Sequence, residues 1–185
     1  MKPLSVSLLL GLMVSGVQGY VHAEGSSCPE TLDHSFRLLA GEQQQRLCDA
    51  HRDKLILVVN TASQCGYTYQ YEGLEHLQQR FAEGGLVVVG FPSNDFGRQE
   101  PGAEQQIQAF CRDQYSIQFP IYEKIHAAKG LAHPFIEGLA QRAGEYPSWN
   151  FHKYLIDRQG NVVGSWGGRT EPESAELVGV IKRYL

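Results

Sequence analysis

Two uninterrupted apolar runs stand out along the chain, LILVVN at residues 55–60 and LVVVGF at residues 86–91. Runs of this kind are typical of strands that are buried on both faces of a sheet. Between them, apolar side chains recur every three or four residues, as on one face of a helix that ends at Gly84 and Gly85. These side chains are Tyr67, Tyr71, Leu74, Leu77 and Phe81. The pattern predicts a β-α-β unit with parallel strands and a right-handed crossover.

The pattern beyond this unit predicts further helices and a hairpin. We expect a helix over residues 104–115 and another that starts at Pro134 and ends at Gly144. Residues 153–166, KYLIDRQGNVVGSW, have the form of two strands joined by a turn. The capping-box spacing of residues 170–173 predicts the start of a last helix. Its expected inward residues are Leu177, Ile181 and Leu185.

The segment HSFRLLAGEQQQRLC, residues 34–48, predicts a short, weak hairpin around Gly41. The chain contains neither internal repeats nor low-complexity linkers, so we expect a single domain over residues 24–185. A parallel β-α-β unit followed by a helix, an antiparallel hairpin and a helix is the order of a thioredoxin-like fold, with a mixed central sheet flanked by helices. Periodicity alone establishes only the α/β class.

Composition places the chain among soluble, globular proteins. Of its 185 residues, 42% are hydrophobic and 19% are charged. The formal net charge is −4, and the longest basic run is the pair Lys182 and Arg183. Proteins that bind nucleic acid usually carry a basic patch or stripe, so the charge pattern argues against that class.

Residues 1–23 have the pattern of a secretory signal peptide. Lys2 is followed by an apolar run of about 14 residues, which fits the apolar region of a signal and is short for a bilayer span. Residues 21–23, Val-His-Ala, offer a small-residue cleavage site, with Gly19 as a second choice. We therefore expect an exported protein, periplasmic or secreted, without a stable membrane anchor. An uncleaved anchor is the alternative.

The four cysteines are Cys28, Cys48, Cys65 and Cys111. No two of them form a C-x-x-C pair, and the seven histidines include no H-x-x-x-H pair. The spacings typical of zinc sites and of thioredoxin-type redox sites are therefore missing. We expect neither a metal ion nor an organic cofactor.

Cys65 stands at a position where chemistry is expected. It follows the carboxyl end of the first predicted strand, and ligands and catalytic groups gather at that edge of open α/β sheets. The amino end of the following helix offers unpaired N–H groups and a partial positive charge, which favour a thiolate. A free cysteine can also be a small buried hydrophobe. The polar neighbours Ser63 and Gln64 favour a reactive thiol instead.

Three ordered segments carry a family resemblance: NTASQCGYTYQYEGLE at 60–75, GFPSNDFGRQEPG at 90–102 and WNFHKYLID at 149–157. They resemble the signature segments of the glutathione peroxidase family in its cysteine-containing form, and the similarity runs from about His34 to the C-terminus. The resemblance implies a thioredoxin-like fold and reduction of hydrogen peroxide and organic or lipid hydroperoxides by a thiol. It also implies that Cys65 is the peroxidatic nucleophile, which passes through a sulfenic acid.

The resemblance assigns further residues to the active site. Trp149 and Asn150 match two members of the family's catalytic tetrad, and their N–H donors would hold the thiolate and stabilise the departing oxygen. The fourth member is usually a Gln, but this chain has Asp95 there. An ionised carboxylate donates no hydrogen bond and would oppose a nearby thiolate. Either Asp95 is partly protonated, or it points away while backbone groups or Asn94 take its place.

The short connection between Phe119 and Trp149 resembles the monomeric, bacterial-type branch of the family, so we expect a monomer. Members of that branch use either a thioredoxin-like protein or glutathione as reductant, and the sequence does not choose between them. The Asp95 replacement keeps a second function class open, a non-catalytic redox sensor or inactive homologue on the same fold. A disulfide isomerase is a weaker third alternative, because a C-x-x-C pair is missing.

The remaining cysteines have two expected roles. Related members carry a resolving cysteine near the position of Cys111, but Ile107, Cys111 and Tyr115 also share one helix face, so Cys111 could belong to the core instead. Cys28 and Cys48 lie outside the family segments, and we expect them to form a structural disulfide in an oxidising compartment.

Overall fold

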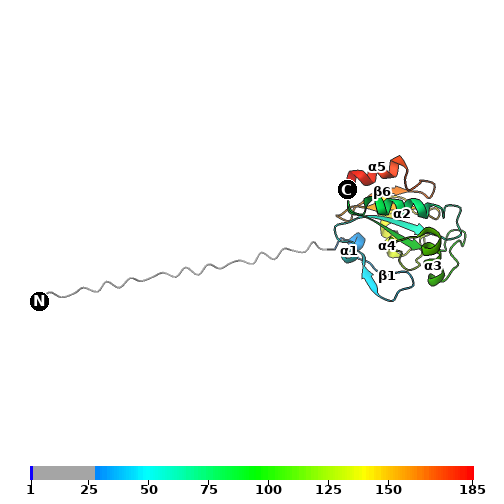
Figure 1. Cartoon of the computed structure of the whole chain (residues 1–185), viewed down its shortest axis with the longest axis horizontal. Coiled ribbons are helices and arrows are strands. Elements are labelled where there is room, and N and C mark those ends of the chain that lie inside the picture. The colour runs from blue at the N-terminus through cyan, green and yellow to red at the C-terminus, as the bar shows by residue number, and fades with distance from the viewer. Residues whose placement is uncertain (2–27) are drawn as a thin grey trace.

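The computed structural model describes residue 1 and residues 28–185 (Figure 1). The predicted signal peptide lies, apart from its first residue, outside the described residues. Among the described helices, none has both the length and the apolar character that a membrane span requires.

A four-stranded mixed sheet forms the centre of the molecule, in the order β4-β3-β5-β6. The strands are β3 (Leu55–Thr61), β4 (Leu86–Pro92), β5 (Lys153–Ile156) and β6 (Val162–Trp166). β3 and β4 are parallel, whereas β5 is antiparallel to both β3 and β6. The predicted β-α-β unit and C-terminal hairpin are therefore confirmed, and so is the thioredoxin-like arrangement that they imply.

Helices cover both faces of this sheet. α2 (Gln70–Phe81), α3 (Glu104–Tyr115) and α5 (Ala175–Tyr184) pack on one face. In Figure 1, α5 lies at the top of the domain and α2 lies below it. α4 (Pro134–Ala143) packs on the other face. Alternation along β3 supplies both layers, because successive side chains of a strand point to opposite faces. The predicted helices over 104–115 and from Pro134 are confirmed.

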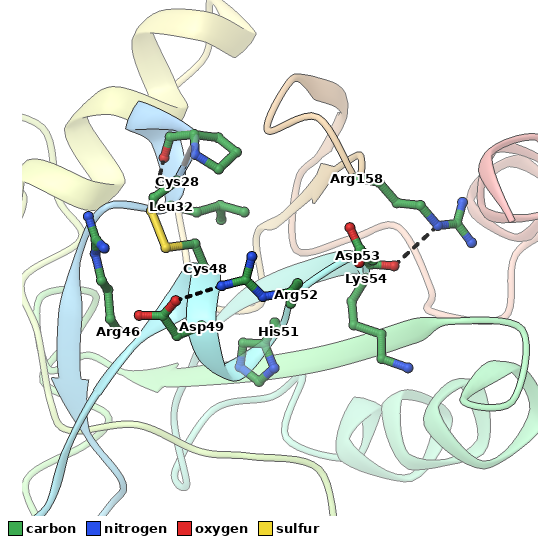
Figure 2. A pocket seen from close by; sticks show the side chains of 11 residues that line it. Cys28, Leu32, Arg46, Cys48, Asp49, His51, Arg52, Asp53, Lys54 and Arg158 are labelled. Atoms are coloured by element: carbon green, nitrogen blue, oxygen red, sulfur yellow. Dashed lines mark hydrogen bonds and ion pairs between the residues drawn. A yellow bond between two sulfur atoms is a disulfide. The ribbon is translucent and has the colours of Figure 1, made fainter. Parts of the chain in front are cut away.

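The N-terminal part consists of short elements closed by a disulfide. These elements are the 3₁₀ helix η1 (Glu30–Leu32), β1 (Ser35–Arg37), β2 (Gln44–Arg46) and α1 (Leu47–Ala50). β1 and β2 form the antiparallel hairpin that was predicted around Gly41. Cys28 and Cys48 are bridged, with their Cα atoms 5.7 Å apart, which confirms the expected pair. Figure 2 shows this bridge beside the charged side chains of Arg46, Asp49 and Arg52.

The start of the last helix differs from the prediction. Ser174, not Thr170, is the N-cap of α5, and its hydroxyl oxygen accepts from the Leu177 N–H at 3.3 Å. The Thr170 carbonyl instead accepts a hydrogen bond from the Lys153 ammonium at 2.8 Å. Leu177 is buried as expected, but Leu185 is 36% exposed at the chain end.

Candidate active site

Cys65 lies in the loop that connects the end of β3 to the start of α2. Thr68 fixes the shape of this loop. Its hydroxyl oxygen accepts from the Cys65 backbone N–H at 3.0 Å and donates to the Ala62 carbonyl at 2.9 Å. The Cys65 carbonyl accepts from the Thr68 N–H at 3.1 Å. The loop is therefore held in place before α2 begins at Gln70.

Cys65 is partly buried and belongs to no disulfide. The backbone N–H of Tyr67 donates to Sγ at 3.4 Å. A backbone donor aimed at sulfur is an arrangement that stabilises a thiolate. Tyr67 was predicted to lie on the helix face, but α2 begins only at Gln70, which leaves the Tyr67 N–H free to reach the sulfur.

Asn60 on β3 fixes a second segment of the site. Its side chain donates to the Trp149 carbonyl at 3.2 Å and accepts from the His152 N–H at 2.9 Å. The Asn60 carbonyl accepts from the Phe151 N–H at 2.7 Å. Phe151 has a φ of 61°, which bulky residues rarely adopt and which persists only where surrounding contacts enforce it. These contacts with Asn60 hold the turn that positions Trp149.

Asn150 is fully buried and joins this segment to the loop after β4. Its Nδ2 donates to the Phe96 carbonyl at 3.3 Å and to Gln99 Oε1 at 3.0 Å. Both amide hydrogens of Asn150 are thereby used within the protein, so the expected donation from this amide to the sulfur is not observed. The Gln99 amide nitrogen makes no hydrogen bond within the described part of the chain. The Gln99 carbonyl accepts from the N–H of Gln64, the residue before Cys65, at 3.0 Å.

A hollow of about 740 Å³ opens between these segments, and we call it the Cys65 pocket. Gly66 and Tyr67, which directly follow Cys65, line it together with Gln99 and Trp149. The Trp149 side chain is 39% exposed. The pocket therefore brings the chain next to Cys65 together with two side chains that carry N–H donors.

Gly168 and Thr170 also line the pocket, and buried side chains bind their carbonyl groups. A Cβ atom on Gly168 would collide with the Asn150 carbonyl oxygen, so glycine permits this close approach. The Gly168 carbonyl accepts from Gln70 Nε2 at 2.7 Å. The buried Lys153 ammonium donates to Gln70 Oε1 at 2.6 Å and to the Thr170 carbonyl at 2.8 Å, and burial lowers the pKa of Lys153 to about 7.

Comparison with known proteins identifies the family. The family model for glutathione peroxidase matches residues 33–139. The glutathione peroxidase homolog BsaA of Halalkalibacterium halodurans is 44% identical over 76% of this chain and 90% of that protein. The chain belongs to the glutathione peroxidase family. The hydroperoxy fatty acid reductase gpx1 of Synechocystis is 42% identical over 71% of this chain and 83% of that protein.

Among solved structures, the crystal structure of Trgpx in apo form superposes with a TM-score of 0.63 at 33% sequence identity. The match covers 83% of this chain and 97% of that chain. The fold and the family assignment therefore agree, and the predicted resemblance to glutathione peroxidases is confirmed.

Asp95, at the position where these peroxidases usually carry Gln, is turned toward another part of the molecule. Its carboxylate accepts from His126 Nδ1 at 2.8 Å and from the N–H groups of Ala127 and Ala128 at 2.6 and 3.0 Å. Burial opposes ionisation, but the hydrogen bonds from Ala128, His126 and Ala127 outweigh it and lower the pKa of Asp95. These contacts agree with the interpretation in which the side chain points away from the sulfur, and a catalytic role of Asp95 stays an untested prediction.

Cys111 lies on α3 and is only 2% exposed. Burial raises its pKa to about 11. It lines a separate groove of about 380 Å³ with Leu39 and Phe119, and it is not part of the Cys65 pocket. Cys65 packs against the core cluster to which Cys111 belongs, and both thiols are free. The buried position agrees with the core interpretation, and the resolving role stays a prediction.

The sequence analysis missed three residues of this site, Asn60, Gln99 and Lys153. Each lies inside a family segment, so position alone gave a signal. Their partners, however, come from other segments, and only the folded chain shows which groups they bind.

Proposed function

We propose that the protein is a thiol peroxidase that reduces hydrogen peroxide and organic hydroperoxides at Cys65. The observation that carries this proposal is the free, partly buried Cys65, whose sulfur accepts the Tyr67 N–H beside a pocket that Trp149 and Gln99 line. Membership of the glutathione peroxidase family supports it.

In the first step the Cys65 thiolate attacks one peroxide oxygen. A sulfur–oxygen bond forms, the O–O bond breaks, and the other oxygen takes up a proton and leaves as an alcohol or water. The sulfur becomes a sulfenic acid. The Tyr67 N–H holds the attacking sulfur, and donors in the pocket stabilise the charge on the leaving oxygen.

Trp149 and Gln99 supply these donors. The Trp149 indole N–H makes no hydrogen bond within the described residues, and neither does the Gln99 amide nitrogen. Asn150 holds the Gln99 side chain through its carbonyl oxygen, which leaves the N–H groups of Gln99 for the substrate. Gln99 thus takes the part of the amide that the family usually carries at the position of Asp95.

In the second step Cys111 resolves the sulfenic acid. The Cys111 sulfur attacks Cys65, a disulfide forms, and the hydroxyl group leaves with the Cys111 proton as water. Because Cys111 is buried on α3, this helix must loosen before the two Cα atoms come within about 7 Å. A thioredoxin-like protein or glutathione then reduces the disulfide.

The Asp95 replacement was the reason to consider a redox sensor or inactive homologue. The Asp95 carboxylate binds residues 126–128 and makes no hydrogen bond to the Cys65 sulfur among the described residues. The geometry therefore favours the enzyme over this alternative.

We also propose that the protein is exported and acts as a monomer. The bridge between Cys28 and Cys48 supports export, because disulfides persist in oxidising compartments. The connection from Phe119 to Trp149, with α4 as its one regular element, supports the monomer.

Peroxide consumption by the purified, exported protein tests the proposal. Hydrogen peroxide should be consumed with a thioredoxin system or with glutathione, and Cys65→Ser should abolish the reaction. Cys111→Ser should remove thioredoxin-dependent turnover but spare the first oxidation of Cys65 in a single turnover. A Cys65→Ser protein that still consumes peroxide would contradict the proposal. Full thioredoxin-dependent turnover of Cys111→Ser would show that Cys111 is a core residue and does not resolve the sulfenic acid.

A further inference from the structure

Glu100 carries a buried carboxylate that the first oxidation step does not use. Only 1% of the residue is exposed. Its Oε1 accepts from the Ser63 hydroxyl at 2.7 Å, whereas Oε2 is buried and has no hydrogen-bond partner among residues 28–185. Burial raises the pKa of Glu100, although the hydrogen bonds of Ser63 and the charge of Lys124 oppose this. Buried polar atoms without a partner are rare in folded proteins, so this oxygen calls for an explanation.

This carboxylate lies between the two segments that carry the free cysteines. It lines a groove of about 450 Å³. Ser63, which precedes Cys65 by two residues, forms one side of the groove. Ile107 of α3, one helical turn before Cys111, forms the other. A movement of Cys111 toward Cys65 therefore takes place beside this carboxylate.

The Tyr71 hydroxyl lies in the core between α2 and α3, near the Cys111 thiol. Tyr71 is fully buried and belongs to the same core cluster as Cys111. Its hydroxyl has no hydrogen-bond partner in the described part of the chain. Burial raises the pKa of Tyr71, and the Cys111 thiol and the Glu100 carboxylate raise it further. Because both groups act on this hydroxyl, it is placed to pass a proton from the thiol to the carboxylate.

The resolving step has to move one proton. Cys111 attacks as a thiolate, but burial raises its pKa to about 11, so nearly all of it is protonated at neutral pH. The hydroxyl group that leaves the Cys65 sulfenic acid needs a proton to become water. A carboxylate that takes a proton on the Cys111 side and returns it on the Cys65 side meets both needs without a net change in its own charge.

We propose that Glu100 carries the proton of the resolving step from Cys111 to the departing hydroxyl group of Cys65. The carboxylate takes the proton through the Tyr71 hydroxyl. The S–S bond then forms, the S–O bond breaks, the Cys111 sulfur is oxidised and the Cys65 sulfur is reduced. The carboxyl group returns the proton through the Ser63 hydroxyl, and water leaves. This inference rests on the proposed resolving role of Cys111 and adds to it the group that moves the proton.

The test follows the two steps of a single turnover without any reductant. Reduced protein is mixed with one equivalent of hydrogen peroxide and quenched at increasing times with a thiol-alkylating reagent and a reagent that traps sulfenic acids. Intact mass then separates the thiol, the sulfenic acid and the disulfide. Glu100→Gln should slow disulfide formation about 100-fold relative to Cys65 oxidation, as expected when a general base is lost.

The pH profile distinguishes a proton carrier from a structural residue. In the wild-type protein, the rate of disulfide formation should fall as the pH falls through the raised pKa of Glu100, because only the ionised carboxylate accepts a proton. In Glu100→Gln, the rate should rise about tenfold per pH unit toward the Cys111 pKa of about 11, because only preformed thiolate reacts. The titratable groups that act on Glu100 within residues 28–185 are Lys124, Tyr71 and Cys111, and burial places the pKa values of Tyr71 and Cys111 above the neutral range.

Three further variants serve as controls. Glu100→Asp keeps a carboxylate and should retain part of the rate of disulfide formation and the wild-type shape of its pH profile. Tyr71→Phe should slow the same step, because the hydroxyl that passes the proton is lost. Asp157→Asn removes another buried carboxylate, which accepts from the N–H groups of Gln159 and Asn161 in the turn between β5 and β6. It controls for lost stability and should leave disulfide formation and its pH profile unchanged.

The outcomes separate this inference from the proposed function. If hydrogen peroxide fails to oxidise Cys65 in the wild-type protein, or if no bond to Cys111 follows, the proposed function fails in that step and the role of Glu100 falls with it. If the bond forms in Glu100→Gln with the wild-type rate and pH profile, only the role of Glu100 is overturned. Equal slowing of both steps in Glu100→Gln would show a structural residue and would also overturn the inference.

Discussion

The two ends of β3 carry cysteines in opposite chemical states. Before the strand begins, Cys48 on α1 is bridged to Cys28, and the bridge closes the short N-terminal elements. After the strand ends, Cys65 is a free thiol in a loop beside an open pocket. The strand β3 therefore separates a cysteine in a disulfide from a cysteine with a free thiol.

The surroundings explain this difference. At the disulfide end, the bond links short elements that form few regular hydrogen bonds of their own, although Leu32, Phe36 and Leu47 pack into the core. At the other end, hydrogen bonds from Thr68, Asn60 and Lys153 hold the backbone, so the Cys65 side chain is not needed as a covalent link. Stability and chemistry should therefore respond to different substitutions.

The largest expected effect is on activity at Cys65. Cys65→Ser should lower the rate of peroxide reduction by at least about 10³-fold, because the nucleophile is lost. The free energy of unfolding, from urea denaturation followed by circular dichroism, should stay within about 0.5 kcal/mol of the wild-type value. A strong loss of stability in this variant would show that Cys65 also contributes to the stability of the fold.

Acid should destabilise both ends, because each contains a buried, neutral histidine. Burial lowers the pKa of His51, which bonds Tyr122, and of His152, which bonds Ser165, to about 4. The unfolded chain therefore binds more protons between about pH 6.5 and pH 4. Stability is full above that window and falls through it, by about 3 kcal/mol for each histidine.

Urea denaturation at several pH values measures this loss. His51→Gln should weaken the pH dependence of the unfolding free energy in that window, because it removes one of the buried histidines whose pKa burial lowers. An unaltered pH dependence in His51→Gln would contradict the assignment.

The disulfide end should respond in stability alone. Replacing Cys28 and Cys48 together by Ser should lower the free energy of unfolding by about 3 kcal/mol, because their sequence separation of 20 residues closes a loop of that size in the unfolded chain. Peroxidase activity of the folded fraction should be retained. A loss of peroxidase activity in protein that is still folded would show that the bridge also has a role at Cys65.

A smaller loss of activity is expected at Gln99. Gln99→Ala should lower kcat/KM for hydrogen peroxide about tenfold, as expected for one lost hydrogen bond to a charged group. Gln99→Glu keeps the acceptor for Asn150 but loses the donors, and it should not restore activity. A Gln99→Glu enzyme close to the wild type would mean that Gln99 only positions Asn150. Gln141→Ala, on the exposed side of α4, is the control.

The smallest effect is expected at Asp95. Asp95→Asn should cost about 1 kcal/mol of stability, because its carboxylate accepts three hydrogen bonds from residues 126–128. The rate of Cys65 oxidation should change less than twofold. A large change in that rate would show that Asp95 takes part in the chemistry after all.

Local signals made much of the fold predictable. The apolar runs located β3 and β4 to within one residue, and α3 spans the predicted residues 104–115. The predicted start of α5 at Thr170 was wrong, because the chain first makes a turn in which the Ser174 N–H donates to the Glu171 carbonyl, and the Ser174 hydroxyl then caps the helix. The spacing of a capping box does not show whether such a turn precedes the helix.

The site was predictable where a motif named the residue and unpredictable where a distant partner decides its direction. The family segments pointed to Cys65 and Trp149, which lie at the pocket or directly beside it. Asp95 is drawn away by groups 31 to 33 residues further along the chain. Gln99 gains its position from Asn150, 51 residues away. The local sequence around Asp95 or Gln99 does not indicate either of these distant partners.

The exposure of Trp149 gives the protein an optical reporter of its own. The chain has two tryptophans. Trp149 stands 39% exposed in the Cys65 pocket, whereas Trp166 is 6% exposed and donates its indole N–H to Glu176 at 3.0 Å. An aqueous quencher such as acrylamide should reach Trp149 first, and Trp166 then serves as the internal reference. Occupancy of the pocket is therefore measurable by intrinsic fluorescence, without a label and without turnover.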